Sequence, residues 1–229
     1  MNYMFSYCIS LKSIPDISNY EFSNITEIFG IFSNCYSLIS LLNISNWDIY
    51  NVMTMNGLFK KCSSLKSLPD IFNWNSKKIT DFSNICCECQ SLKSLQDISK
   101  LDMSKASDIS FMFSKYKSLI TLPDISNWNI SNVNNFSNLF SSCESLISIP
   151  NISKWNTSNP NNFENIFGKC ISLRSLPDIS KWNTSDVKNF SYLFSSCESL
   201  ISLPDISKWK TYKAINMSYL FLECSSFIS

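Results

Sequence analysis

Cysteine is the residue whose type and spacing in this chain could do the most chemistry. Eight of the ten cysteines recur at a constant 27-residue interval or at twice that interval, and Tyr116 holds the one vacant position of the series: Cys8, Cys35, Cys62, Cys89, Cys143, Cys170, Cys197 and Cys224. Such a column could form a disulfide ladder, a redox site or part of a core. A disulfide needs Cα atoms within about 7 Å, and free cysteine is among the most buried residue types. We predict a core column, because Tyr116 shows that not every repeat requires a thiol.

A second cysteine group, Cys86, Cys87 and Cys89 with Cys62 near it in register, has the residue type of a zinc site. Structural zinc is held by four cysteine or histidine ligands, and the chain contains no histidine. Cys86 also occupies a position that is phenylalanine in other repeats (Phe59, Phe113 and Phe140). We therefore predict a core position with a smaller side chain, no metal site and no cofactor.

Catalytic chemistry has little support in the composition. Without histidine the chain lacks the commonest general base, and its three glycines cannot build a phosphate-binding loop such as GxGxxG. One serine column is invariant along the chain: Ser10, Ser37, Ser64, Ser91, Ser118, Ser145, Ser172, Ser199 and Ser226. No histidine and no lysine at a fixed offset accompanies it, so a serine nucleophile is not expected. We predict no catalytic residues and no enzyme.

An aspartate column is the next candidate site: Asp16, Asp70, Asp97, Asp124, Asp178 and Asp205, with Asn43 and Asn151 completing it. Carboxylates about 5 Å apart in water would repel by about 0.8 kcal/mol per pair, and such a stripe could bind a cation or another ligand. Aspartate also accepts backbone amides in turns. We expect the turn role, and the ligand stripe remains the alternative.

The charge balance of 19 basic and 18 acidic residues gives no net field toward nucleic acid or anionic membranes. No apolar run approaches the roughly 18 residues that cross a bilayer. The first residues, MNYMFSYC, have no signal-peptide pattern and no anchor is visible, so the sequence alone leaves the compartment unknown. We expect no nucleic acid and no membrane insertion.

The 27-residue spacing extends to the whole chain, which is a single repeat array over residues 1–229. Each unit is close to C-x-S-L-x-S-L-P-D-I-S-x-W-N-x-S-x-V-x-N-F-S-x-L-F-x-x. All six tryptophans share one column, and isoleucine fills another in every unit. The predicted coils are a partial one at 1–7, full ones at 8–34, 35–61, 62–88, 89–115, 116–142, 143–169, 170–196 and 197–223, and a partial one at 224–229.

Local patterns predict the elements of one coil. Leu146 and Ile149 predict a very short strand that Pro150 ends, because proline cannot donate to a ladder. A Trp-bearing connector follows. The apolar stripe at i, i+3, i+6, i+7 and i+10 predicts a short amphipathic helix (Val133, Phe136, Leu139, Phe140 and Cys143). We predict an α/β solenoid, a leucine-rich-repeat-like right-handed superhelix of 27-residue coils with a parallel sheet spaced about 4.8 Å per coil.

The segment SLITLPDISNWNISNVNNFSNLFSSC, residues 118–143, resembles the BspA-type leucine-rich repeat of microbial surface proteins, whose coil reads SLxSLDLSNWDTSNVTNMSxMFxxC. The match recurs over essentially the whole chain, with a proline added before the aspartate and phenylalanine often replacing methionine. The resemblance implies a cell-surface or secreted protein with roles in adhesion and protein binding. It implies no catalytic residues.

The outward neighbours of the predicted strand vary in type, unlike the core columns: Lys12, Ile39, Lys66, Lys93, Ile120, Ile147, Arg174 and Ile201. This mixture suits a recognition surface, and drift on a solvent face is the alternative. The first hypothesis is a protein-binding or adhesion module whose partner is another protein of unknown identity. A structural spacer or self-assembling coat or filament element is the second. A hydrolase resembling parallel β-helix enzymes is remote, since no coil carries acid-base residues.

The fourth coil and the two chain ends depart from the pattern. The fourth coil has Gln96 for proline, Leu101 for tryptophan and Ala106 for valine, and we expect a decayed unit, with a bend or a specialised site as alternatives. The sequence starts inside a predicted helix, stops after a new strand and has no polar caps. We expect either a fragment of a longer array or ends that associate with other chains.

Overall fold

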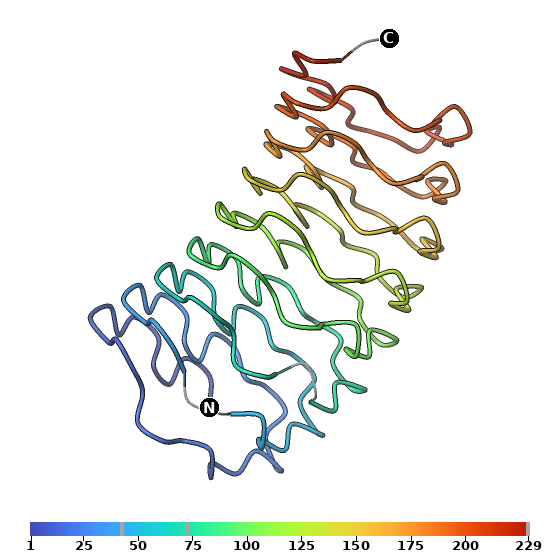
Figure 1. Cartoon of the computed structure of the whole chain (residues 1–229). Coiled ribbons are helices and arrows are strands. Elements are labelled where there is room, and N and C mark those ends of the chain that lie inside the picture. The colour runs from blue at the N-terminus through green and yellow to red at the C-terminus, as the bar shows by residue number, and fades with distance from the viewer. Residues whose placement is uncertain (42–43, 72–73, 228–229) are drawn as a thin grey trace.

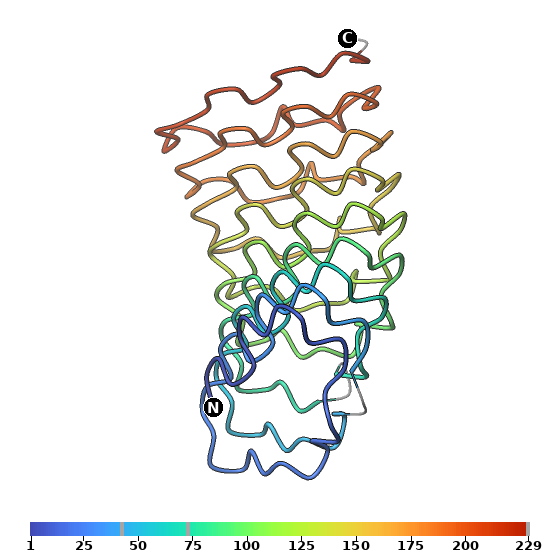
Figure 2. The ribbon, with the colours of Figure 1, turned by 90° about the vertical axis from the view of Figure 1, so that its left-hand side faces the viewer.

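The chain winds into a continuous stack of coils in a computed structural model, which describes residues 1–41, 44–71 and 74–227. The coils follow one another in chain order from the N-terminus at one end to the C-terminus at the other (Figure 1), and the view turned by 90° shows the same succession of layers (Figure 2). Single parallel β-bridges join equivalent positions of successive coils: Glu27 to Thr54, Thr54 to Asp81, Asp81 to Asp108, Asp108 to Asn135, Asn135 to Asn162, Asn162 to Asn189 and Asn189 to Asn216. The chain is therefore a solenoid.

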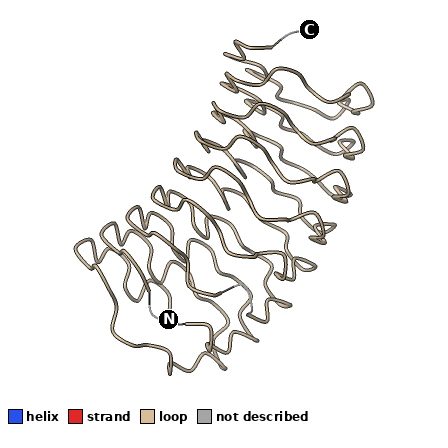
Figure 3. Cartoon of the chain, in the orientation of Figure 1, coloured by secondary structure: helices blue, strands red, loops and turns tan. Residues whose placement is uncertain are grey.

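Turns and extended segments make up the coils. Over residues 1–41, 44–71 and 74–227 the structure has no α-helix and no strand longer than one bridged residue (Figure 3). The α/β description of the fold was therefore wrong for these residues. The predicted helix through Phe136 and Phe140 is replaced by a series of tight turns.

The turns explain why the helical stripe was misleading. The amides of Leu139, Ser141 and Cys143 each donate to the carbonyl oxygen three residues earlier, at 3.2 Å in all three cases. Asn138 and Ser142 have φ angles of 58° and 59°, in the left-handed region that a right-handed helix excludes. These turns start two residues apart, and each is closed by a bond that spans three residues. They place Phe136, Leu139 and Phe140 on the inside, which is nearly the pattern that a helix would give.

The remaining amides of this segment bond to the next coil. The amides of Phe136, Asn138, Phe140 and Ser142 donate to carbonyl oxygens of that coil at 3.1, 2.8, 2.9 and 2.8 Å. Intracoil and intercoil bonds thus alternate along the backbone. A buried backbone needs partners for its polar groups, and here half of the donors depend on the neighbouring coil.

The strand was also predicted at the wrong place in the coil. The amide of Leu146 donates within its own coil to Cys143 at 3.1 Å, and Ile147 alone donates to the preceding coil, to the Ile120 carbonyl oxygen at 3.1 Å. The bridged column instead contains Asn135, close to the start of the predicted helix. One or two backbone bonds to the preceding coil hold this segment where it is bonded, as at Ile147 or at Ser199 and Ile201, and the segment forms no strand in the described residues.

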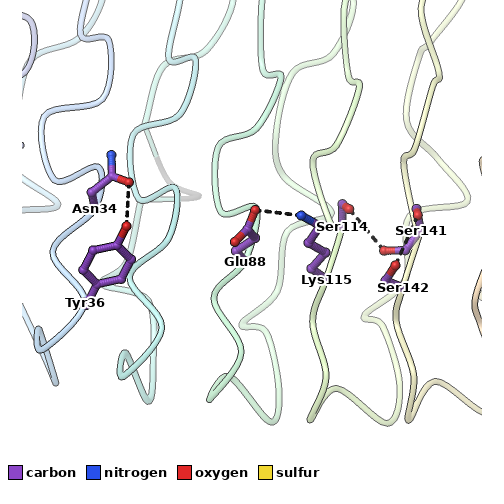
Figure 4. A network of polar contacts seen from close by, with 7 residues as sticks. All are labelled: Asn34, Tyr36, Glu88, Ser114, Lys115, Ser141 and Ser142. Carbon is purple, nitrogen blue, oxygen red and sulfur yellow. Dashed lines mark hydrogen bonds and ion pairs between the residues drawn. The ribbon is translucent and has the colours of Figure 1, made fainter.

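Residues with a left-handed backbone recur in pairs along the stack, as at Asn138 and Ser142. Polar side chains near these pairs make hydrogen bonds and ion pairs. The Lys115 ammonium pairs with the Glu88 carboxylate of the preceding coil at 2.9 Å, and the Tyr36 hydroxyl donates to Asn34 Oδ1 at 3.2 Å (Figure 4). The buried Ser114 hydroxyl donates to the Ser141 carbonyl oxygen at 3.1 Å. Polar side chains on this edge therefore add to the backbone bonds between coils.

One core runs through the stack, and two aromatic columns lie within it. Phenylalanine rings of successive coils stack nearly parallel with centroids 5.4 to 5.9 Å apart, and the column is interrupted at Cys86. Tryptophans stack at 5.8 to 6.5 Å, and Leu101 interrupts that column. Each coil covers the aromatic face of the next, so no coil can bury its own core alone.

Candidate functional site

Six of the eight column cysteines are buried in the core, as predicted, whereas Cys224 is partly buried and Cys8 is exposed. The Cys143 sulfur contacts the Phe113 carbonyl oxygen at 3.0 Å, and every other column member except Cys8 repeats this contact with the equivalent residue of the preceding coil. Cys143 is fully buried, and burial raises the pKa of its thiol to about 12. All ten cysteines are free thiols. The column therefore packs the interior and is poorly suited to nucleophilic or redox chemistry at neutral pH.

The divergent cysteines are also buried. Cys86, Cys87 and Cys89 have exposed fractions of 3%, 2% and 0%, and burial raises the pKa of each thiol. Within the described part of the chain, no group of three or more histidine, cysteine, aspartate or glutamate side chains is placed to hold a metal ion. The Tyr116 hydroxyl lies beside Cys86, and it makes no hydrogen bond within this same part of the chain.

Five aspartates of the column each close a turn in their own coil. Asp124 Oδ1 accepts the Ser126 amide at 2.9 Å, and the same bond forms at Asp16, Asp97, Asp178 and Asp205. The backbone and side-chain hydrogen bonds of Ser126 hold the pKa of Asp124 below its ordinary value. Asn151 makes the equivalent bond to Ser153 at 3.0 Å, so a neutral amide also suffices. Asn43 lies outside the described residues.

The variable column is brought together on the surface. Lys12, Ile39, Lys66, Lys93, Ile120, Ile147, Arg174 and Ile201 are all exposed. Backbone bonds link most consecutive members, as where Arg174 donates to Ile147 at 3.4 Å and Ile201 to Arg174 at 3.3 Å. The leucine one position before each member points inward, and Leu119, Leu146 and Leu173 are fully buried. We call these eight residues the variable column.

A depression interrupts the variable column at the fourth coil. It has a volume of about 450 Å³ and is lined by Lys66, Ser91, Lys93 and Ser118. Sequence reasoning missed it, although the departures of this coil, among them Gln96, were visible. Gln96 replaces a proline that other coils use to fix the chain after the column.

Stacked coils, an inward leucine in each and a common aromatic core define a solenoid repeat protein of the leucine-rich-repeat kind. The chain belongs to the family described as "Mycoplasma protein of unknown function, DUF285", whose profile matches residues 1–121 and 116–229. None of the curated proteins matches it significantly. Within the described ranges, no helical segment has the length and apolar character that crossing a membrane requires.

Solved structures similar to this chain include several bacterial leucine-rich-repeat proteins. The T. pallidum leucine-rich-repeat protein is 18% identical, with a TM-score of 0.49 over 77% of this chain and 72% of that one. A leucine-rich-repeat protein from Bacteroides ovatus is 18% identical, with a TM-score of 0.39 over 99% of this chain and 56% of that one, so this chain spans little more than half its length. A leucine-rich cell surface protein from Faecalibacterium prausnitzii is 16% identical, with a TM-score of 0.33 over 94% and 74%.

Proposed function

We propose that the chain is a non-enzymatic repeat module that binds another protein through the variable column. One observation carries the proposal. Four isoleucines in this column are exposed, at 39% for Ile39, 53% for Ile120, 43% for Ile147 and 51% for Ile201. Isoleucine is usually buried, and exposed apolar side chains that recur along one line favour a protein interface over a solvated face.

The proposal includes the array itself. Residues 1–229 form a single right-handed array with the coil boundaries given above, and the regular bonds between equivalent positions of successive coils support this division. The balanced charge disfavours nucleic acid as the partner. The resemblance to BspA-type repeats supports a cell-surface or secreted location and a role in adhesion.

A capture experiment tests the proposal. The tagged chain serves as bait in extracts and medium of the source cells and of cells to which they attach, and bound proteins are quantified by mass spectrometry. We expect Ile120→Asp, Ile147→Asp and Ile201→Asp, combined in one variant, to abolish capture of the specific partner. The matched control is Met53→Asp, an equally exposed apolar residue outside the column at 50%. Equal capture by both variants and the wild type would refute the proposal.

A further inference from the structure

Lys66 and Lys93 are neighbouring members of the variable column, one coil apart, and both face the depression at the fourth coil. Both side chains are exposed. The ion pairs in the described ranges involve Lys115, Lys117 and Lys213 and leave these two ammonium groups without a carboxylate. Two like charges therefore stand side by side facing solvent.

The backbone bonding between column members is also reduced at this point. Lys66 donates to the Ile39 carbonyl oxygen at 3.1 Å and Ile147 donates to Ile120 at 3.1 Å, but the amides of Lys93 and Ile120 make no such intercoil bond in the part of the chain described. The series of backbone bonds along the variable column is thus interrupted on both sides of Lys93. The nearby Ser91 amide still donates to the Ser63 carbonyl oxygen of the preceding coil at 3.2 Å. The serine hydroxyls of Ser91 and Ser118 line the resulting depression, so polar donors surround the two lysines.

The lysines are flanked by exposed aliphatic side chains. Along four consecutive coils the column reads Ile39, Lys66, Lys93 and Ile120, and the isoleucines are 39% and 53% exposed. Ring centroids of equivalent aromatic residues in successive coils lie 5.4 to 6.5 Å apart in the core. An α-helix advances about 5.4 Å per turn. Over four coils, a helix lying along the column would therefore present about one residue to each coil.

We propose that this segment binds an acidic amphipathic helix of a partner protein. Two carboxylates on successive turns of the helix face Lys66 and Lys93, and aliphatic side chains one turn further out on each side pack against Ile39 and Ile120. The serine hydroxyls donate additional hydrogen bonds to the carboxylates. This inference rests on the proposed protein-binding function and names the chemistry of the partner.

Two synthetic helical peptides of about 20 residues and identical composition test it. One presents Leu, Glu, Glu and Leu on successive turns of one face, and the other presents Glu, Leu, Leu and Glu. Fluorescence anisotropy with the full chain should show the first peptide binding about tenfold more tightly, with an affinity that falls as salt rises. The double variant Lys66→Glu, Lys93→Glu should lose this difference. The control variant Lys12→Glu, Arg174→Glu reverses two charges elsewhere in the same column and should keep it.

The result that overturns the inference differs from the one that overturns the proposed function. The inference is wrong if neither peptide binds, if both bind equally, if both double variants weaken binding alike, or if an oligonucleotide of equal charge binds as well as the first peptide. If the isoleucine variant loses capture of a protein partner and the Lys66→Glu, Lys93→Glu variant retains it, protein binding stands and the acidic helix is rejected.

Discussion

The Tyr116 side chain lies against Cys86 in the core. One of these residues is larger, and the other smaller, than the residue that its column usually holds. Tyr116 replaces a cysteine, and Cys86 replaces a phenylalanine. In other coils the two equivalent positions join a cysteine sulfur to a phenylalanine carbonyl oxygen, as at Cys143 and Phe113. Tyr116 is fully buried and its ring lies 6.3 Å from that of Phe113. The larger residue at one position thus fills the space that the smaller one leaves.

This pairing predicts strong coupling between the two positions. Cys86→Phe alone should overpack the core and reduce the free energy of unfolding by about 1 to 3 kcal/mol. Tyr116→Cys alone should leave a cavity and cost about 2 to 5 kcal/mol. The double variant restores the residues that other coils have, and it should recover most of both losses. Chemical denaturation of the four proteins measures the coupling, and additive losses would contradict the pairing.

The Tyr116 hydroxyl gives a separate prediction. Its oxygen is buried and makes no hydrogen bond of regular geometry in the described part of the chain, and the Cys86 thiol beside it is only a weak partner. A buried hydroxyl without a strong partner is destabilising. Tyr116→Phe keeps the ring and removes this group, so we expect the free energy of unfolding to rise by up to about 1 kcal/mol. A loss of more than about 1 kcal/mol in the same denaturation experiment would show that the hydroxyl has a partner.

The tryptophan column predicts a loss of stability from a single missing N–H group. Trp128 Nε1 donates to the Ile98 carbonyl oxygen of the preceding coil at 3.0 Å. Trp128→Phe keeps an aromatic ring in the stack but removes one of the two hydrogen bonds to this oxygen, which then keeps only the bond from the Leu101 amide at 3.2 Å. The expected cost is about 0.5 to 1.5 kcal/mol. The control is Trp209→Phe. Trp209 Nε1 donates to the Ile179 carbonyl oxygen at 3.1 Å, and its indole is half-buried near the last coil. Equal losses in thermal unfolding would contradict the argument, since water can replace the bond only at Trp209.

The repeat, the core columns and the surface position of the variable column could be predicted from the sequence, because identical spacing of Trp and Ile requires identical environments. The helix could not. Tight turns closed by bonds that span three residues and a helix of about 3.6 residues per turn both place Phe136, Leu139 and Phe140 on one side. The turns differ from a helix in the left-handed backbone at positions such as Asn138. Phe111 and Tyr192 adopt the same left-handed conformation in other coils, although it is unfavourable for bulky residues.

The depression at Lys66 and Lys93 could not be predicted for a different reason. It depends on which backbone amides reach the neighbouring coil, and this geometry is set by packing across the fourth coil rather than by any local pattern. The substitution Gln96 marked the coil as different without indicating that the surface would open there. The lysines themselves were recognised as column members.

The aspartate column predicts how stability depends on pH. Hydrogen bonds from Ser126 and its equivalents lower the pKa of Asp124, Asp16, Asp97, Asp178 and Asp205 in the folded state. Their contribution is therefore present above the unfolded pKa of about 4 and lost as the pH falls through the lower folded value. We expect constant stability from about pH 7 to 5 and a decline below about pH 4.

Substitutions at Asp124 separate the turn role from a ligand role. Asp124→Asn keeps an oxygen that accepts the Ser126 amide, as Asn151 does for Ser153, whereas Asp124→Ala removes it. Thermal unfolding at pH 7 should show the alanine variant less stable and the asparagine variant close to wild type. If the asparagine variant is stable but loses a bound cation or partner, the carboxylate is a ligand and the turn is not its only role.

The thiols provide a prediction about the core as a whole. Cys8 is exposed, Cys224 is partly exposed and the other eight thiols are buried. Burial raises the pKa of Cys143 and of Cys86 to about 12, so neither forms appreciable thiolate near pH 8. Titration of the native protein with a chromogenic disulfide at about pH 8 should show one fast thiol, absent in Cys8→Ser, and a slower one at Cys224. The buried eight should react only when denaturant separates the coils, because each thiol is shielded by the neighbouring coil. Rapid reaction of several thiols in the native protein would mean that the coils do not enclose a common core.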